Sequence, residues 1–148
     1  MPMHYVINSI TANDILAHDR TFGRLCEEAQ RSFHAGNYFA SLACLFILAE
    51  SITKFKLEKT HEKFYDLIEE ASAKKVFSED EYIALNELRS IRNKLFHEND
   101  YSCFIDINNK VYPLDEDETK KLLYDYYKPL IFGITFTTLQ GQITKINN

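Results

Sequence analysis

A run of seven apolar residues near the middle of the chain most constrains the fold. Residues 42–48 read Leu-Ala-Cys-Leu-Phe-Ile-Leu, and they lie within a longer stretch, 38–57, whose apolar positions have helical spacing. A helix that is apolar on every side has to be covered on every side. We therefore expect residues 38–57 to form a central helix with other helices packed around it.

The scarcity of turn residues supports a helical fold. The 148 residues include only four glycines and three prolines, whereas all-β folds use more of both in their turns. Hydrophobic residues make up 45% and charged residues 26% of the chain, as in ordinary globular domains. A chain of this length forms one domain by default. We expect a single all-α domain over residues 1–148, with residues 1–12 as an N-terminal arm.

Helical spacing predicts five segments along the chain. They cover residues 14–35, 38–57, 62–75, 79 to 96 or 97, and 114–144, the last with a kink at Pro129. Ser78 and Glu81 have the residue types and spacing of a capping box that opens the fourth segment. In residues 101–114, two short stretches with apolar residues lie on either side of Asn108 and Asn109. This pattern predicts a short β-hairpin or an ordered loop. The expected architecture is a bundle of four to five helices with this insert before the last helix.

Charge and cysteine content limit the classes of function. The formal net charge is −5, so a nucleic-acid role needs a local site rather than a generally basic surface. Cys26, Cys44 and Cys103 are odd in number and lack metal-ligand spacing, which indicates a reducing compartment. The five histidines are scattered, so we expect neither a metal nor a cofactor. No signal peptide or membrane-spanning run is apparent, which predicts a cytoplasmic protein without membrane contact.

The candidate chemistry lies at the end of the fourth predicted helix. Arg92 borders the apolar seam of that helix, where an unpaired charge is costly, so it needs a partner or a ligand. Asn93 and His97 are four residues apart and share one face. His97 is at the C-terminal end, where the helix dipole favours the protonated imidazole. An arginine, an amide and a titratable histidine together can hold a phosphate and move a proton.

A second charged residue points to the same place. Glu50 lies within the apolar stripe of the 38–57 helix and should be ion-paired, and Arg92 is its most economical partner. Two interpretations follow from the residues alone: a structural Glu50–Arg92 clamp with His97 as a helix cap, or a phosphate-binding site that uses His97. Arg89 and Lys94 lie in the same stretch and are further candidates for substrate binding.

Residues 92–97, Arg-Asn-Lys-Leu-Phe-His, resemble the Arg-x4-His motif of HEPN domains (higher eukaryotes and prokaryotes nucleotide-binding). In that superfamily a polar residue typically follows the arginine, as Asn93 does here. Residues 37–51 resemble its long helix, in which an acidic residue faces the motif. The layout is similar over roughly residues 25–135, with some likeness to mannitol-repressor-like HEPN proteins. The resemblance implies a helical bundle that forms a homodimer, with two motifs facing one cleft.

The resemblance also implies a function. Many HEPN proteins are metal-independent endoribonucleases that act as toxins, in phage defence or in RNA processing. On this reading Arg92, Asn93 and His97 are catalytic, Glu50 supports Arg92, and RNA is the substrate. The alternative is an inactive HEPN-like module that docks an antitoxin, another regulatory protein or a nucleotide. It is favoured by the net charge, by the acidic residues 98 and 100, and by Asn99, where toxins paired with a nucleotidyltransferase antitoxin usually carry a tyrosine.

Overall fold

The computed structural model of the chain describes residues 10–60, 62–96 and 104–147, with side chains described up to residue 141. The described residues form six helices and one two-stranded sheet. In chain order these are α1 (Ala12–Leu16), α2 (Arg20–His34), α3 (Tyr38–Leu57), α4 (Phe64–Ala73), α5 (Glu79–Phe96), β1 (Phe104–Ile107), β2 (Lys110–Pro113) and α6 (Asp117–Asn147). The predicted all-α bundle with a hairpin before the last helix is confirmed. The described residues hold six helices, not the four to five expected.

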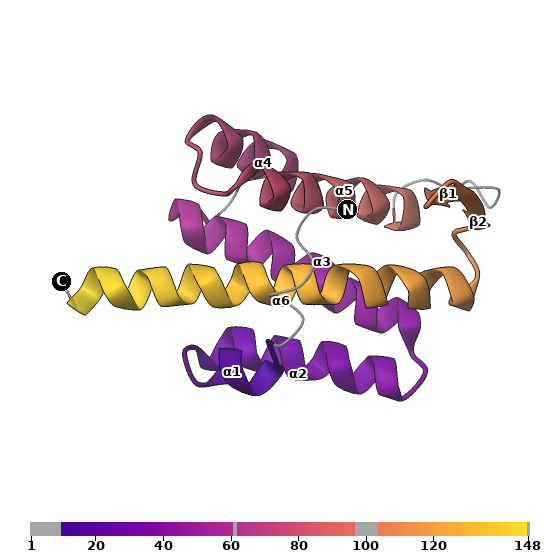
Figure 1. Cartoon of the computed structure of the whole chain (residues 1–148), viewed down its shortest axis with the longest axis horizontal. Helices are drawn as coiled ribbons and strands as arrows, with labels where there is room; N and C mark the ends of the chain where they lie inside the picture. The colour runs from indigo at the N-terminus through magenta and orange to yellow at the C-terminus, as the bar shows by residue number, and fades with distance from the viewer. Residues whose placement is uncertain (1–9, 61, 97–103, 148) are drawn as a thin grey trace.

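Helix α3 lies in the centre of the bundle and packs against α2, α4, α5 and α6. In Figure 1, α6 runs across the middle of the molecule, with α4 and α5 on one side and α1 and α2 on the other. Most of the apolar run is buried, as predicted, but Ile47 is 52% exposed. Within the described part of the chain, α3 is also the helix long and apolar enough to cross a membrane, with a mean hydropathy of 1.4, and half of that stretch is buried inside the bundle.

The first predicted helix, over residues 14–35, is divided in two in the structure. Asp19 is extended, with a φ of −154°, and its Oδ1 accepts a hydrogen bond from the backbone N–H of Phe22 at 2.9 Å. This is the geometry of an N-cap, so a new helix begins at residue 20. Residues 1–9 of the predicted arm lie outside the described residues, whereas Ala12 is buried and begins α1.

Gly23 allows α1 and α2 to pack closely. A Cβ placed on Gly23 would lie 2.4 Å from the Cα of Leu16. We predict that Gly23→Ala lowers the free energy of unfolding by about 1–3 kcal/mol, because a backbone atom has to move. Gly141→Ala is the control, since a Cβ there would meet no atom within 4 Å beyond its own stretch of helix backbone, and it should be neutral or stabilising. Equal urea midpoints for Gly23→Ala and the wild type would contradict the close packing.

The hairpin forms where the sequence predicts it. Strands β1 and β2 pair antiparallel with Ile105 opposite Tyr112. The turn residues Asn108 and Asn109 have φ values of 54° and 65°, a conformation that asparagine tolerates better than most residues. In Figure 1 the hairpin lies beside the C-terminal end of α5 and the start of α6.

Helix α5 begins with the predicted capping box. The backbone N–H of Glu81 donates to Ser78 Oγ at 3.2 Å, and the backbone N–H of Ser78 donates to Glu81 Oε1 at 2.8 Å. Two backbone donors are thereby satisfied at the point where the helix starts. Helix α6 begins at Asp117 and continues through Pro129, and Figure 1 shows it as one long helix.

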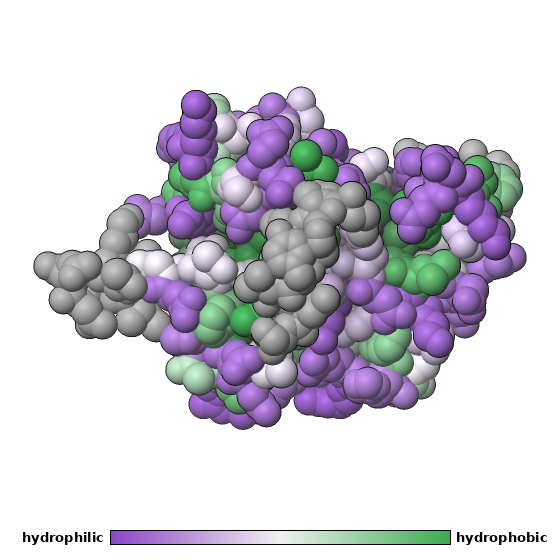
Figure 2. Space-filling model, in the orientation of Figure 1, coloured by the Kyte–Doolittle hydropathy of each residue, from purple (hydrophilic) through white to green (hydrophobic). Residues whose placement is uncertain are grey.

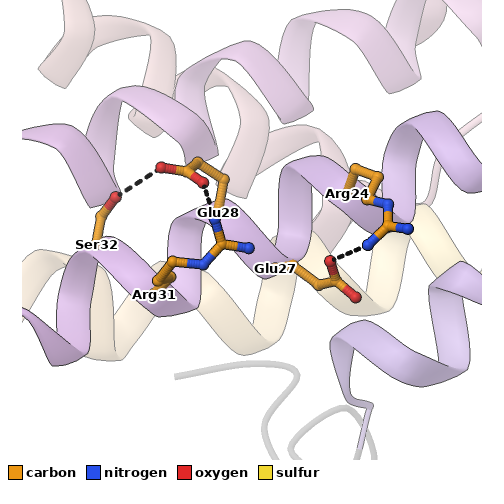
Figure 3. A network of polar contacts seen from close by, with 5 residues as sticks. All are labelled: Arg24, Glu27, Glu28, Arg31 and Ser32. Carbon is orange, nitrogen blue, oxygen red and sulfur yellow. Dashed lines mark hydrogen bonds and ion pairs between the residues drawn. The ribbon is translucent and has the colours of Figure 1, made fainter.

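The outer face of α2 is solvated and carries local ion pairs. Arg31 Nη1 lies 2.8 Å from Glu28 Oε2, and Arg24 Nη1 lies 3.0 Å from Glu27 Oε2 (Figure 3). Such exposed pairs add little stability. Hydrophilic residues cover most of the surface seen in Figure 2, with smaller hydrophobic areas between them.

On the inner face of α2, burial raises the pKa of Cys26 to about 12, so this thiol stays protonated and serves as a packing residue.

Candidate functional site

A hollow of about 400 Å³ opens on the surface where α3, α4 and α5 meet. Its lining residues are Glu50, Lys63, Phe64, Tyr65, Arg89, Arg92 and Asn93. The lining therefore contains three cationic side chains and one carboxylate, although the whole chain has a net charge of −5. A concave site with this local excess of positive charge is suited to an anion.

The predicted contact between Glu50 and Arg92 is confirmed. Arg92 Nη1 lies 3.5 Å from Glu50 Oε2, and the two side chains are 29% and 22% exposed. Glu50 Oε1 lies 3.5 Å from Lys54 Nζ, so two cations share the carboxylate. Arg92 also lines the hollow, so its guanidinium can meet an acceptor that enters it.

Arg89 is held in place by its own helix. Its Nε and Nη2 donate to Asn86 Oδ1 at 3.2 and 3.1 Å. Its guanidinium carbon lies 5.0 Å from the ring centre of Tyr65, which comes from α4. The cation and the ring attract each other in this arrangement. The pair joins α5 to α4 at the rim of the hollow.

The two residues that follow Arg92 in sequence have different surroundings. Asn93 is half-buried and lines the hollow, whereas Lys94 is half-buried but does not line it. Residues 89 and 93 are four apart and share a helix face, and residue 94 is turned away from that face. The structure thus groups Arg89, Arg92 and Asn93 with Glu50, and leaves Lys94 outside this group.

His97 directly follows the last residue of α5, and it lies outside the described residues, as do residues 98 to 103. Its predicted role therefore stays a prediction. The end of α5 is fixed against α3 by aromatic contacts. The ring centre of Phe96 lies 5.2 Å from that of Phe39 and 5.6 Å from that of Phe46, both edge to face. Helix α5 therefore ends packed against α3, one helical turn beyond Arg92.

The sequence analysis missed Tyr65 as a site residue. The neighbouring residues Phe64, Leu67 and Ile68 form the buried seam of α4, as their spacing predicts. Tyr65 falls outside that seam and is 53% exposed. Its position outside the apolar spacing of α4 is a sequence signal for an exposed aromatic residue, but it does not indicate the contact with Arg89.

A second hollow, of about 280 Å³, lies between the hairpin, α5 and α6. At its edge the Tyr127 hydroxyl donates to Glu87 Oε2 at 2.6 Å. Burial, together with this hydrogen bond, raises the pKa of Tyr127. The Tyr127–Glu87 pair links α6 to α5, and the hollow has no cationic lining residue.

In the part of the chain that the structure describes, no group of three or more His, Cys, Asp or Glu side chains could hold a metal ion.

No protein-family model matches this sequence, and the comparisons with curated proteins and with solved structures give no match either. The described residues form an all-α bundle with a cationic hollow between α3, α4 and α5. The residues of that hollow are what indicate a function.

Proposed function

We propose that the protein is a HEPN-type endoribonuclease that cleaves RNA without a metal ion. The observation that carries the proposal is the hollow, which three cationic side chains and one carboxylate line. It is built on α5, the helix that ends one residue before His97. Three cationic side chains at one concave site give this acidic chain a preferred place for a phosphate.

The proposed reaction uses the substrate's own nucleophile. The ribose 2′-hydroxyl attacks the adjacent phosphate, so a bond forms between the 2′-oxygen and phosphorus. The bond from phosphorus to the 5′-oxygen breaks, which leaves a 2′,3′-cyclic phosphate and a 5′-hydroxyl. His97 accepts the proton from the 2′-hydroxyl or supplies one to the leaving oxygen, because an ordinary imidazole pKa of ~6.5 suits transfer near neutrality.

Arg92 binds the phosphate in this mechanism. Its planar guanidinium donates two parallel hydrogen bonds and stabilises the charge that develops in the transition state. Asn93, beside it in the hollow, orients the phosphate or His97. Glu50 is a positioning residue, because its ion pair with Arg92 at 3.5 Å limits where the guanidinium can lie.

We further propose that the protein acts as a homodimer. An apolar patch lies beside the hollow on α3 and α5, and we call its residues Phe39, Ala43, Ile47 and Phe96 the α3–α5 patch. Phe39, Ile47 and Phe96 are 47%, 52% and 40% exposed. Ile47 precedes Glu50 by one helical turn, and Phe96 follows Arg92 by one turn. A second copy seated on the α3–α5 patch would therefore bring two hollows to one interface.

The dimer proposal predicts the effect of one substitution. Ile47→Asp should be monomeric at tens of micromolar, where the wild type is a dimer, because a dimer of this kind has to bury about 1,000 Å² or more and a carboxylate cannot be buried unpaired. Ile83→Asp is the matched control, since Ile83 is also exposed, at 40%, and lies ~20 Å from Phe96 along α5. Sedimentation velocity measures both variants. A monomeric wild type would contradict the proposal.

The biological setting that fits this activity is a cytoplasmic toxin, phage-defence or RNA-processing protein with an antitoxin or regulatory partner. The second candidate function is a module that binds a nucleotide or a protein without cleavage, and the net charge of −5 favours it. Mixed RNA incubated with the protein in EDTA distinguishes the two. Cleavage by the wild type that is lost in His97→Ala supports the enzyme, and intact RNA with a folded wild-type protein supports the module.

A further inference from the structure

We propose that Tyr65 and Arg89 form a subsite for a nucleobase, so that the hollow binds single-stranded RNA with one base stacked next to the phosphate at Arg92. The inference rests on the proposed ribonuclease function. It assigns a binding site to the nucleobase, which the phosphate site at Arg92 does not contact. It starts from the exposure of Tyr65. This large aromatic residue remains 53% exposed at the rim of the hollow.

The subsite is preformed. Arg89 is fixed by two hydrogen bonds to Asn86, at 3.2 and 3.1 Å, and its guanidinium in turn lies 5.0 Å from the centre of the Tyr65 ring. Aromatic rings and arginine planes are the surfaces on which unstacked bases bind. Because Asn86 and Arg89 already restrict the ring, stacking on it costs little further conformational entropy.

The subsite lies at the right distance from the phosphate site. Arg89 precedes Arg92 by three residues, which is ~4.5 Å along the helix axis. Tyr65 lines the same hollow as Arg92. One nucleotide can therefore place its phosphate at Arg92 and a base against Tyr65. Bases in a duplex are stacked on each other and unavailable, so this contact selects single strands.

The test measures binding of a single-stranded 2′-O-methyl oligoribonucleotide, which the proposed mechanism does not cleave, and of the same backbone without bases. Tyr65→Ala should weaken binding of the base-containing strand roughly 5- to 100-fold, the usual range for one stacked base. Binding of the abasic strand should not change. Tyr65→Phe, which keeps the ring, should bind like the wild type. Tyr112→Ala is the control, because Lys110 lies over that ring at 5.1 Å and Tyr112 lines neither described hollow.

The outcomes separate this proposal from the proposed function. If Arg92→Ala loses binding but Tyr65→Ala binds the base-containing strand like the wild type, the subsite is wrong and the phosphate site stands. If Tyr65→Ala weakens both strands equally, its ring does not recognise a base, and the subsite is again wrong. If the wild type binds neither strand, the proposed function fails and the subsite fails with it.

Discussion

Replacing Arg92 by alanine should lower the rate of RNA cleavage by about 10²–10³-fold, the usual loss when one transition-state donor is removed. Arg92 pairs with Glu50 at 3.5 Å and lines a hollow that suits a phosphate. The fold should survive the change, because Glu50 keeps Lys54 at 3.5 Å and is not left as an unpaired carboxylate.

Two further variants make this prediction specific. Arg92→Lys should recover only part of the rate, since an ammonium group lacks the planar fork that binds two phosphate oxygens. Arg31→Ala should cleave like the wild type, because Arg31 pairs with Glu28 on the outer face of α2 and does not line the hollow. The initial rates of cleavage of one oligoribonucleotide in EDTA are compared for Arg92→Ala, Arg92→Lys and Arg31→Ala. Wild-type activity in Arg92→Ala would show that this residue does not bind the reacting phosphate.

Replacing Phe46 by alanine should lower the free energy of unfolding by about 3–5 kcal/mol, the cost of removing a fully buried phenylalanine ring. Phe46 is 2% exposed in the central helix. Its ring also packs edge to face against Phe96, with 5.6 Å between ring centres. The substitution therefore removes core volume and loosens the end of α5, from which the chain continues to His97.

Phe39→Ala is the matched control for the stability measurement. It makes the same chemical change on the same helix, but Phe39 is 47% exposed, so the loss should be less than half as large. Urea denaturation at low protein concentration measures both variants. Equal losses would contradict the placement of α3 at the centre of the bundle.

The sequence predicts the parts of this fold that local patterns control. The limits of α3 and the capping box of α5 follow from residue spacing and from Ser78 and Glu81. The Glu50–Arg92 contact was predictable because each charge borders an apolar seam and needs a partner. The break between α1 and α2 was not, since the apolar spacing continues through it and the close approach at Gly23 is a tertiary contact.

The candidate site, like the fold, was predictable only where its residues lie close together in the sequence. Its α5 residues lie in one stretch of sequence, so Arg89, Arg92 and Asn93 could be named together. Tyr65 could not be joined to them, because the contact with Arg89 depends on how α4 is rotated against α5. Helix orientation is set by the packing of Phe64, Leu67 and Ile68 on the core, and residue spacing does not report it.

The chemical groups at the RNA ends after cleavage are the decisive test of the proposed reaction. A defined oligoribonucleotide is incubated with the wild-type protein in EDTA, and the masses of its fragments are measured by mass spectrometry. We predict a 2′,3′-cyclic phosphate on one fragment and a 5′-hydroxyl on the other, with no cleavage when the sugar before the cut carries a 2′-O-methyl group. A 5′-phosphate product, cleavage of the methylated strand, or activity that appears only with a divalent metal would contradict it.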